Sequence, residues 1–485
     1  MFVRKIKSRN STCFQIGRKE SDRFVLIKHV GCANTPSEIE VLRIKAREQL
    51  ARIVFHNQLS LFPEAKNPPK AKLLHWHITG FHQVFGSIYD SLGFPDNLLR
   101  DLSIARIVYP RSKLSTLRYL KQYLGINLDK NTIYRFLDTL SKENLTAIAF
   151  SFVSRRNQGI SLIFYDVTTL SFETETEDDF RKKGYSKEHR NDLPQILIGL
   201  FVDSDGYPFD FDVFEGNSFE GYTFKIAIDS LIKRYQFESL TVVADAGMLS
   251  DDNLQFLAKK GLSYIVGARI RNLSDDLTQI MHTHDFTKEI YLQIPLPKSK
   301  LIVDFSSDRQ KKDLLNREKL IKKLQDRLSS GQQLIRKSKY LILEAGGKVL
   351  GLDQEKIDSD KLFDGLKGYI TNVEGLDAAA VIEHYHNLWR VEKAFRMSKN
   401  DLREKPVYHY TKKRITSHLL VCFVSLLVMK EAERYLKSKN YSLENAIEML
   451  GKVGQGEVRI GNVSLEVDSE LDPEAQSLLE LFTGH

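Results

Sequence analysis

Two apolar runs that each end in an aspartate place the strongest constraint on the fold of this 485-residue chain. Leu162–Tyr165 has the length and the apolar and aromatic content of a buried strand, and Asp166 follows it directly. Ser239–Ala244 repeats the pattern and is followed by Asp245. These runs predict two strands of one sheet, each with a carboxylate at its end.

The residues around these runs predict the rest of the sheet. Ile196–Val202 and Phe209–Phe214 have strand character and are separated by residues 203–206, Asp-Ser-Asp-Gly, a turn typical of hairpins. Helical periodicity covers residues 219–235 and 251–260. Three antiparallel strands followed by strand and helix alternation predict an α/β fold with a mixed sheet.

A third acidic residue lies on a predicted helix at Tyr385–Lys399. At about 100° per residue, Tyr385, Glu392 and Lys399 fall on one stripe. A second, apolar stripe predicted to face the core contains Leu388, Val391, Phe395 and Leu402. The alternative is an ordinary amphipathic surface helix with solvated charges.

The remaining segments predict a division into seven parts. We expect an α+β N-terminal region at 1–58, with a helix capped by Thr35, a linker at 59–75 and a helical domain at 76–150. The core would occupy 155–270 and 368–440. A β-rich insertion at 271–367 and a helical C-terminal tail at 441–485 complete the list. The insertion contains a charged helix at 307–328, which suits either phosphate contact or simple solvation.

Two helices in the helical domain resemble a helix-turn-helix. The first, from Ser112 to Leu124, carries Leu114, Leu117, Leu120 and Leu124 on one side, and Gly125 ends it. The second begins after Asp129 and leaves Asn131, Thr132 and Arg135 on its outer face, where they could meet a DNA groove. An ordinary helical hairpin explains the same pattern equally well.

Composition is compatible with a nucleic-acid partner. The formal net charge is +8 and the pI is near 9.0. The three cysteines, Cys13, Cys32 and Cys422, show no metal-ligand spacing and predict neither a disulfide nor a zinc site. The longest apolar run, Leu419–Met429, is too short to cross a bilayer, so we expect a buried helix, no membrane and a cytoplasmic protein.

Two strand-terminal aspartates and a helix-borne glutamate suit two-metal phosphoryl transfer. Carboxylate oxygens are the ligands that Mg²⁺ prefers, and stiff strand ends would fix the positions of a metal pair. Each acid alone is more often a cap or turn residue. Their combination and order carry the prediction.

In that combination the sequence resembles the DDE transposases of prokaryotic insertion sequences, specifically the superfamily with a Tyr-x2-Arg-x3-Glu-x6-Lys signature. Tyr385, Glu392 and Lys399 match that spacing. The motifs around the two aspartates match as well, as do His189, Gln195 and Glu215-Gly216-Asn217. The resemblance implies an RNase H-like mixed-sheet catalytic core with a β-rich insertion, preceded by a small α+β region and a helical DNA-binding domain.

By the same resemblance, Asp166, Asp245 and Glu392 would be the catalytic, metal-binding triad. The metal would be a pair of Mg²⁺ ions, for which Mn²⁺ would substitute. Tyr385 and Lys399 would contact DNA phosphates.

One position departs from the signature, because Leu388 stands where the family has arginine. Arg396, within about 40° of Glu392 on the helix, could restore the missing charge, and Arg390 is a less well placed candidate. Trp389 either stacks on an unpaired base or simply packs against the core.

These features together predict a cut-and-paste DNA transposase. Its partners would be double-stranded DNA, namely the terminal inverted repeats and the target, and a second copy of the chain in the synaptic complex. We expect it at the nucleoid of a prokaryotic cytoplasm. The alternatives are an inactive transposase-derived DNA-binding regulator and an RNase H-like structure-specific nuclease, which flanking inverted repeats would argue against.

Overall fold

The computed structural model describes residues 1–8, 11–20, 23–59, 71–187, 190–248, 250–330, 339–343, 349–460 and 462–483. The chain divides into two compact units, each described here by itself. The first comprises Met1–His75 and Gly456–Val467, and the second Trp76–Gln455 and Asp468–His485.

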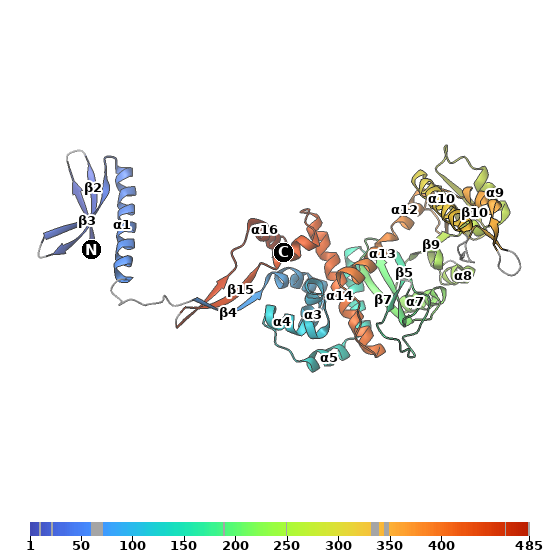
Figure 1. The fold of residues 1–485 in the computed structure, drawn as a ribbon, viewed down its shortest axis with the longest axis horizontal. Helices are drawn as coiled ribbons and strands as arrows, with labels where there is room; N and C mark the ends of the chain where they lie inside the picture. The colour runs from blue at the N-terminus through green and yellow to red at the C-terminus, as the bar shows by residue number, and fades with distance from the viewer. Residues whose placement is uncertain are drawn as a thin grey trace. The chain divides into compact units, whose positions relative to one another are not determined.

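The N-terminal part of the first unit is a three-stranded antiparallel sheet with one helix. The strands, in spatial order, are β1 (Phe2–Lys7), β2 (Thr12–Glu20) and β3 (Arg23–Ala33), and the helix is α1 (Pro36–Leu59). Figure 1 shows α1 alongside this sheet. Thr35 and Glu38 cap the helix reciprocally, because each backbone amide donates to the other side chain. The predicted α+β character and helix start are therefore confirmed.

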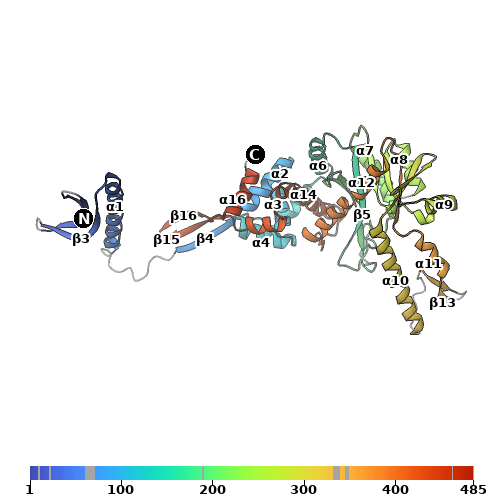
Figure 2. The same cartoon turned by 90° about the horizontal axis from the view of Figure 1, so that it is seen from above.

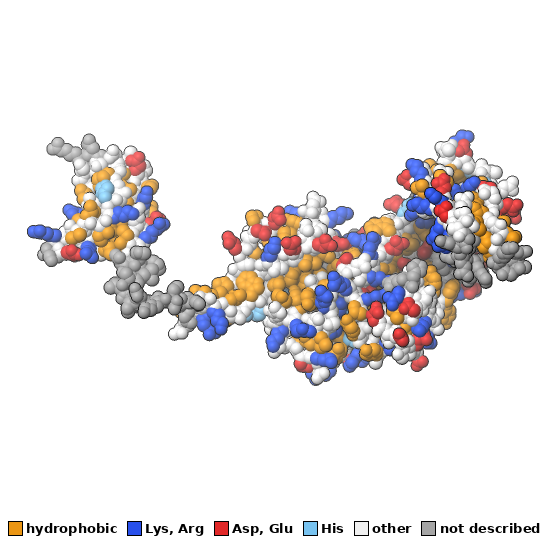
Figure 3. Space-filling view, in the orientation of Figure 1, with side chains coloured by type: hydrophobic (Ala, Val, Ile, Leu, Met, Phe, Trp, Pro, Cys, Tyr) orange, Lys and Arg blue, Asp and Glu red, His pale blue; other side chains and the backbone are white. Residues whose placement is uncertain are grey.

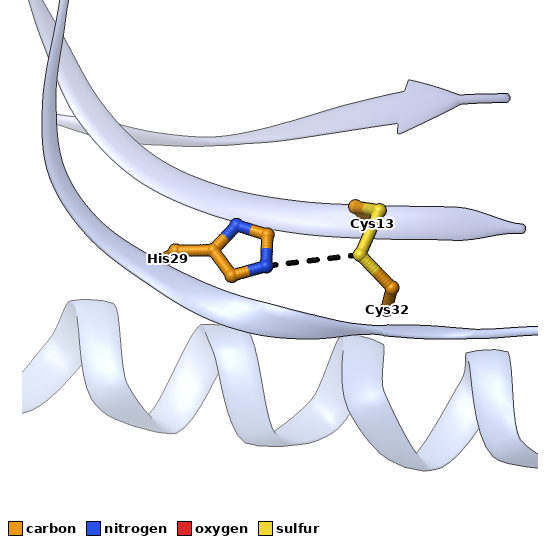
Figure 4. The surroundings of a disulfide bond; sticks show 3 residues. All are labelled: Cys13, His29 and Cys32. Atoms are coloured by element: carbon orange, nitrogen blue, oxygen red, sulfur yellow. Dashed lines mark hydrogen bonds between the residues drawn. A yellow bond between two sulfur atoms is a disulfide. The ribbon is translucent and has the colours of Figure 1, made fainter.

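Cys13 and Cys32 form a disulfide between β2 and β3, with His29 Nε2 3.7 Å from the sulfur of Cys32 (Figure 4). The expectation that no disulfide forms was wrong. The two cysteines are 19 positions apart, and only the strand register brings them directly opposite each other. Cysteine spacing alone does not contain that register.

The second unit is built on an eight-stranded mixed sheet with the order β10-β11-β14-β9-β8-β5-β6-β7. Its strands are β5 (Leu162–Ser171), β6 (Gln195–Asp203), β7 (Pro208–Glu215), β8 (Thr241–Ala244), β9 (Ser263–Ala268), β10 (Tyr291–Leu296), β11 (Ser299–Phe305) and β14 (Leu366–Thr371). The pairs β5–β8 and β8–β9 are parallel, and the others are antiparallel. The predicted α/β fold and mixed sheet are confirmed.

Helices cover this sheet and carry the functional segments. They include α7 (Glu220–Arg234), α8 (Asp251–Lys259), α12 (Ala378–His386), α13 (Trp389–Arg396), the π-helical turn η4 (Met397–Asp401) and α14 (Lys412–Lys437), with short 3₁₀ turns η2 (Ala246–Met248) and η3 (Ile270–Asn272). Along α14, the apolar run Leu419–Met429 is buried, as expected. Among the described residues, α14 alone is long and apolar enough to cross a membrane, but 89% of its most apolar window is buried inside the protein.

Two strands of the predicted insertion join the central sheet, and its other described elements are three helices and a separate two-stranded sheet. Its strands β10 and β11 extend the sheet through β14, so they are not a separate β-rich layer. The other elements are α9 (Asp275–Thr283), α10 (Ser307–Ser329), β12 (Leu341–Leu343), β13 (Val349–Leu352) and α11 (Gln354–Lys361). Leu324, Tyr340, Leu341 and Ile357 form a small apolar cluster of their own where α10 extends beyond the sheet toward α11 and β13 (Figure 2).

The helical domain begins after β4 and contains the predicted helix pair. Its helices are η1 (His82–Gly86), α2 (Ser87–Leu92), α3 (Asn97–Val108), α4 (Lys113–Leu124), α5 (Lys130–Thr139) and α6 (Lys142–Arg156). Ser112 and Asp129 cap α4 and α5, and Gly125 ends α4 at φ +69°. Leu114, predicted to face inward, is 47% exposed, and Lys113 is buried instead.

Two predictions at the ends of this arrangement were wrong. Strand β4 (Ala71–Ile78) begins inside the predicted linker 59–75, whose residues 60–70 lie outside the described residues. The predicted helical tail contains β15 (Gly454–Ile460) and β16 (Val463–Asp468) between α15 (Leu443–Leu450) and α16 (Pro473–Thr483). The three strands form one sheet in the order β16-β15-β4. Alternation of apolar and polar residues over 457–467 is the signal for this hairpin.

Candidate active site

Asp166 and Asp245 lie on neighbouring parallel strands. The β5–β8 register pairs Tyr165 with Ala244, so each aspartate is the next residue along its strand. Adjacent strands are about 4.8 Å apart, which brings the two side chains to one place on the sheet. Asp245 follows the end of β8 as predicted, whereas β5 continues five residues beyond Asp166 to Ser171 because β6 pairs with it over that length.

Each aspartate is anchored by the backbone amide that follows it. Val167 N donates to Asp166 Oδ1 at 2.7 Å, and Ala246 N donates to Asp245 Oδ1 at 2.5 Å. Burial raises the pKa of Asp166, and the neighbouring charges of Asp245 and Glu220 add to the rise, against the opposing effects of Lys187 and the Val167 amide. Burial therefore disfavours the charged form of Asp166, and a nearby positive charge such as that of Lys187 favours it.

Two residues that the sequence prediction missed complete this face of the site. Lys187 Nζ lies 3.6 Å from Asp166 Oδ1 and 3.2 Å from Glu220 Oε1, and it donates to the carbonyl of Val167 at 2.6 Å. Burial lowers the pKa of Lys187, but the carboxylates outweigh it and the pKa is raised. Glu220 comes from the first turn of α7. In the sequence, the only indication that Glu220 belongs to the site is its position three residues after the Gly216-Asn217 pair.

Gly247 lies close to the carboxylates of Glu220 and Asp245. A Cβ added at Gly247 would be 3.6 Å from Glu220 Oε2 and 4.0 Å from Asp245 Oδ2. Glu220 and Asp166 thus share the ammonium group of Lys187, and Glu220 and Asp245 both lie next to Gly247.

The predicted helix 385–399 is interrupted. Between α12 and α13 the amides of Leu388 and Val391 bond three residues back, to Tyr385 and Leu388, as in a 3₁₀ turn. A π-helical turn, η4, follows α13. The stripe predicted for a regular helix therefore runs across two irregular turns, which change the angular step per residue in opposite directions.

Tyr385 and Lys399 nevertheless both reach the two aspartate-bearing strands. Tyr385 is buried and its hydroxyl donates to Asp245 Oδ1 at 3.4 Å. Lys399 Nζ donates to Thr168 Oγ1 at 2.7 Å and to the carbonyl of Thr169 at 3.0 Å, both on β5. The segment is therefore attached to the sheet on either side of the aspartates.

Glu392 is exposed on α13 and is the least closely held of the predicted acids. Its charge, with that of Asp245, raises the pKa of the Tyr385 hydroxyl, for which burial is the larger cause. The same two acids act on Lys367, whose pKa is lowered by burial and by Arg309. Glu392 and Asp245 thus both act electrostatically on Tyr385 and Lys367.

The other residues of the signature segment separate into buried and exposed positions. Leu388 is 7% exposed and belongs to the main core, as its stripe predicted. Trp389 is 50% exposed, so the interpretation as a packed core residue was wrong. Arg390 Nη1 lies 3.4 Å from Asp205 Oδ1 in the β6–β7 turn, whereas Arg396 is exposed.

The helix-turn-helix candidates are only partly available for a ligand. Asn131 and Arg135 are exposed on α5. Thr132 is engaged in the helix cap, where its hydroxyl donates to Asp129 Oδ2 at 2.6 Å. Likewise Arg317 of the charged helix α10 is buried in an ion pair with Asp364 and is not free to contact phosphate.

Residues matching the motif between β5 and β7 have a structural role in this chain. Buried Gln195 donates to the carbonyls of Tyr185 and Gly216 at 2.8 and 2.9 Å. A Cβ at Gly216 would lie 2.0 Å from the carbonyl oxygen of Gln195, so only glycine fits. His189 lies outside the described residues.

The donor set fits a hard divalent cation. Asp166, Asp245, Glu220 and Glu392 offer only carboxylate oxygens, the preferred ligands of Mg²⁺ and Mn²⁺. The ammonium of Lys187 shows that the space between Asp166 and Glu220 accepts a positive charge. In the described part of the chain, no three His, Cys, Asp or Glu side chains are already close enough together to hold a metal ion.

The mixed sheet, with Asp166 and Asp245 at neighbouring parallel strands, agrees with the RNase H-like core expected from the sequence. The sequence profile described as "Transposase DDE domain" matches residues 157–428, more than half of the chain. The chain therefore belongs to the DDE transposase family and is a DNA transposase.

No curated protein matches the chain. A solved structure similar to it is the piggyBac transposase synaptic complex with hairpin DNA. The two share 9% sequence identity over 77% of this chain and 76% of that one, with a TM-score of 0.39.

Proposed function

We propose that this transposase cleaves DNA at the ends of its own element and joins the freed ends to target DNA, using Asp166, Asp245 and Glu392 as its catalytic acids. The observation that carries the proposal is the position of Asp166 and Asp245 on adjacent parallel strands, with a cationic group already seated against Asp166. Glu220, on the far side of that cationic group, is a further carboxylate for the same site.

The metal would be held by oxygen ligands from the sheet and from two helices. Asp166 and Asp245 would supply the ligands from the strands, Glu220 from α7 and Glu392 from α13. When bound, a Mg²⁺ pair activates the attacking oxygen and stabilises the leaving oxygen, and Mn²⁺ is expected to substitute.

The protein groups around the site hold the strand and the acids in position. Tyr385 orients Asp245 through its hydroxyl, and Lys399 supplies a positive charge beside β5 for a DNA phosphate. Exposed Trp389 is available to stack on an unpaired base, and Arg396 and Arg390 are further candidates for phosphate contact. Asn131, Thr132 and Arg135 would meet the duplex from α5, of which Thr132 is the least free.

The reaction proceeds in two balanced displacements. Water attacks the scissile phosphorus, the bond to O3′ breaks, and a 3′-hydroxyl and a 5′-phosphate result. That 3′-hydroxyl then attacks a target phosphodiester, whose own O3′ leaves, so the number of phosphodiester bonds is unchanged. No covalent intermediate with the protein is required.

The partners follow from this chemistry. Two element ends, each with a terminal inverted repeat, must be cut and joined together, which favours a homodimer in the synaptic complex. The net charge of +8 favours association with DNA, consistent with a cytoplasmic, nucleoid-associated protein of a prokaryote.

The test is nicking of a supercoiled plasmid that carries both flanks of the coding region, with Mg²⁺ and separately with Mn²⁺. Loss of an indirect metal contact commonly costs 10- to 100-fold, so Asp245→Asn should lower nicking by at least ~100-fold. Binding of the same DNA should be preserved. Asp251→Asn, an exposed aspartate in the first turn of α8, is the matched control. Nicking that persists in Asp245→Asn would remove Asp245 from the site.

A further inference from the structure

A cavity of about 490 Å³ lies within the second unit, between the α3–α4 helices and the segment that follows η4. Five basic side chains line it, namely Arg106, Arg111, Lys113, Arg403 and Lys405. No aspartate or glutamate does so among the described residues. On the face shown in Figure 3, by contrast, acidic and basic side chains are interspersed. Every aspartate, glutamate, lysine or arginine position in the lining of this cavity is therefore basic.

Lys113 is the most unusual of these residues. It is the first residue of α4 and is only 8% exposed. In the described part of the chain its ammonium group has no ion pair or hydrogen bond, and the charged groups that act on it are Arg106 and Cys422. Burial lowers its pKa to about 7, and the positive charge of Arg106 acts in the same direction. A buried lysine without a counter-charge costs stability, so its presence requires an explanation.

Arg106 is the second buried cation of the cavity. It is 5% exposed on α3, and Nη1 donates to the backbone carbonyls of Leu402 and Arg403 at 3.4 Å each. These contacts orient the guanidinium without neutralising it. The buried carboxyl of Glu404, 4% exposed, interacts electrostatically with Arg106, whereas the charged groups that act on Lys113 include no aspartate or glutamate.

The backbone adds to the positive potential. Ser112, Lys113 and Leu114, at the N-terminus of the twelve-residue helix α4, all line the cavity. The positive end of a helix dipole favours an anion at such a place. Tyr134 and Tyr408 also line the cavity and could contact the sugar or base next to a phosphate.

A basic residue connects the cavity to the strand that bears Asp166. Lys405, which lines the cavity, donates to Ser171 Oγ at 2.8 Å, and Ser171 is the last residue of β5. Ser171 is five residue steps beyond Asp166 along the strand, about 16 Å at roughly 3.3 Å per residue. A DNA strand with its scissile phosphate at Asp166 would need to extend by only a few nucleotides along β5 to reach Lys405.

We propose that this cavity binds a backbone phosphate of the DNA strand being processed, through Lys113, Arg106 and the first turn of α4. The identity of the ligand as DNA rests on the proposed function. That the cavity binds an anion is inferred only from its basic lining, the buried Lys113 and the first turn of α4.

The test compares Lys113→Met with Lys121→Met, which removes an exposed lysine of the same helix. Binding of a short mixed-sequence duplex is measured by fluorescence anisotropy over a range of salt concentrations. Losing one phosphate contact should weaken binding by about tenfold and reduce the slope of log K against log salt by about 1. Lys121→Met should change neither quantity.

A second readout is local to the cavity. His409 and His418 line it, so titration with inorganic phosphate should shift their ring resonances in protein labelled at histidine. Lys113→Met should abolish these shifts. Should that variant not fold, Arg111→Gln, at an exposed lining residue, replaces it and should reduce both responses partially.

The outcomes separate the possible errors. Unchanged DNA binding and salt slope in the variants would overturn the proposal. Phosphate-induced histidine shifts without an effect on DNA binding would mean that the cavity takes a free anion, which also overturns it. Failure of plasmid nicking by the wild-type protein, with the DNA-binding results as expected, would overturn the proposed function alone.

Discussion

The ammonium nitrogen of Lys187 lies 3.2 Å from Glu220 Oε1, although one residue precedes β6 and the other begins α7. The same nitrogen is 3.6 Å from Asp166 Oδ1. A single positive charge is thus shared by two carboxylates of the proposed metal site. A metal ion entering between them must replace it.

Removal of this charge should strengthen metal binding. In Lys187→Met the carboxylates lose a competing cation, and the affinity for Mn²⁺, measured by electron paramagnetic resonance without DNA, should rise about fivefold. That corresponds to ~1 kcal/mol, the upper end for a partly exposed pair, since the lysine side chain is 34% exposed. Lys182→Met, which breaks only the surface pair with Glu215, is the control. Equal or weaker Mn²⁺ binding in Lys187→Met would contradict the shared-site interpretation.

Gly267 on β9 makes room for the hydroxyl of Tyr385. A Cβ at this position would lie 2.5 Å from Tyr385 Oη and 3.1 Å from Cζ. Gly267→Ala should therefore cost about 1–3 kcal/mol of unfolding free energy and reduce plasmid nicking, because the tyrosine must move away from Asp245. In the Tyr385→Phe background the penalty should be smaller, since the closest contact is gone. Additive penalties in the double-mutant cycle would show that the two residues are not coupled.

The sheet could be predicted from the sequence because each of its central strands is indicated by a short, local pattern of apolar residues. Buried runs such as Leu162–Tyr165 are apolar throughout, and turns with glycine and aspartate separate them. The disulfide Cys13–Cys32 and the pairing of β4 with β15 depend instead on register between distant segments, which no local pattern contains.

The part of the site that could be predicted from the sequence is the part formed by residues at predicted strands. Asp166 and Asp245 meet because parallel neighbours bring successive strand positions together. Lys187 and Glu220 were missed because nothing in the sequence indicates that a loop lysine and the first residue of a helix converge. The stripe of Tyr385, Glu392 and Lys399 was predicted for a regular helix, and the sequence did not indicate the 3₁₀ and π turns within this segment.

Lys113 should make the stability of the protein depend on pH. Its pKa is about 7 in the folded protein against 10.5 for the ordinary side chain, so above pH 7 the unfolded chain binds more protons. Stability should then rise with pH between about 7 and 10.5, by up to ~1.4 kcal/mol per pH unit. The charges that act on Lys113 are those of Arg106 on α3 and Cys422 on α14. The other titratable groups of the cavity are Arg111, Arg403, Lys405, His409 and His418, and the buried carboxyl of Glu404 interacts with Arg106. Chemical denaturation at pH 7.5 and 9 should show this rise in the wild type, and a similar rise in Lys113→Met would assign it elsewhere.

Arg396 and Arg390 allow the missing arginine of the signature to be tested directly. Leu388 is buried, so the charge that the family has at this position must come from another residue or be absent. Arg390 already pairs with Asp205 in the β6–β7 turn, whereas Arg396 is exposed one helical turn beyond Glu392. Arg396→Ala should weaken binding of the element's end about fivefold and lower the salt slope by about 1, while Arg390→Ala changes the slope little.

The measurement is anisotropy with a duplex that contains the flank of the coding region, at several salt concentrations. A restored charge at the signature position provides the complementary experiment, because Leu388→Arg in the Arg396→Ala background would recover binding if the two positions serve the same phosphate. Leu388 is packed in the main core, so this substitution also costs stability, and folding is checked by thermal unfolding before affinities are compared. If Arg396→Ala binds and nicks DNA as the wild type does, Arg396 does not replace the arginine of the family signature. Binding of the element's end would then not require a positive charge at either position.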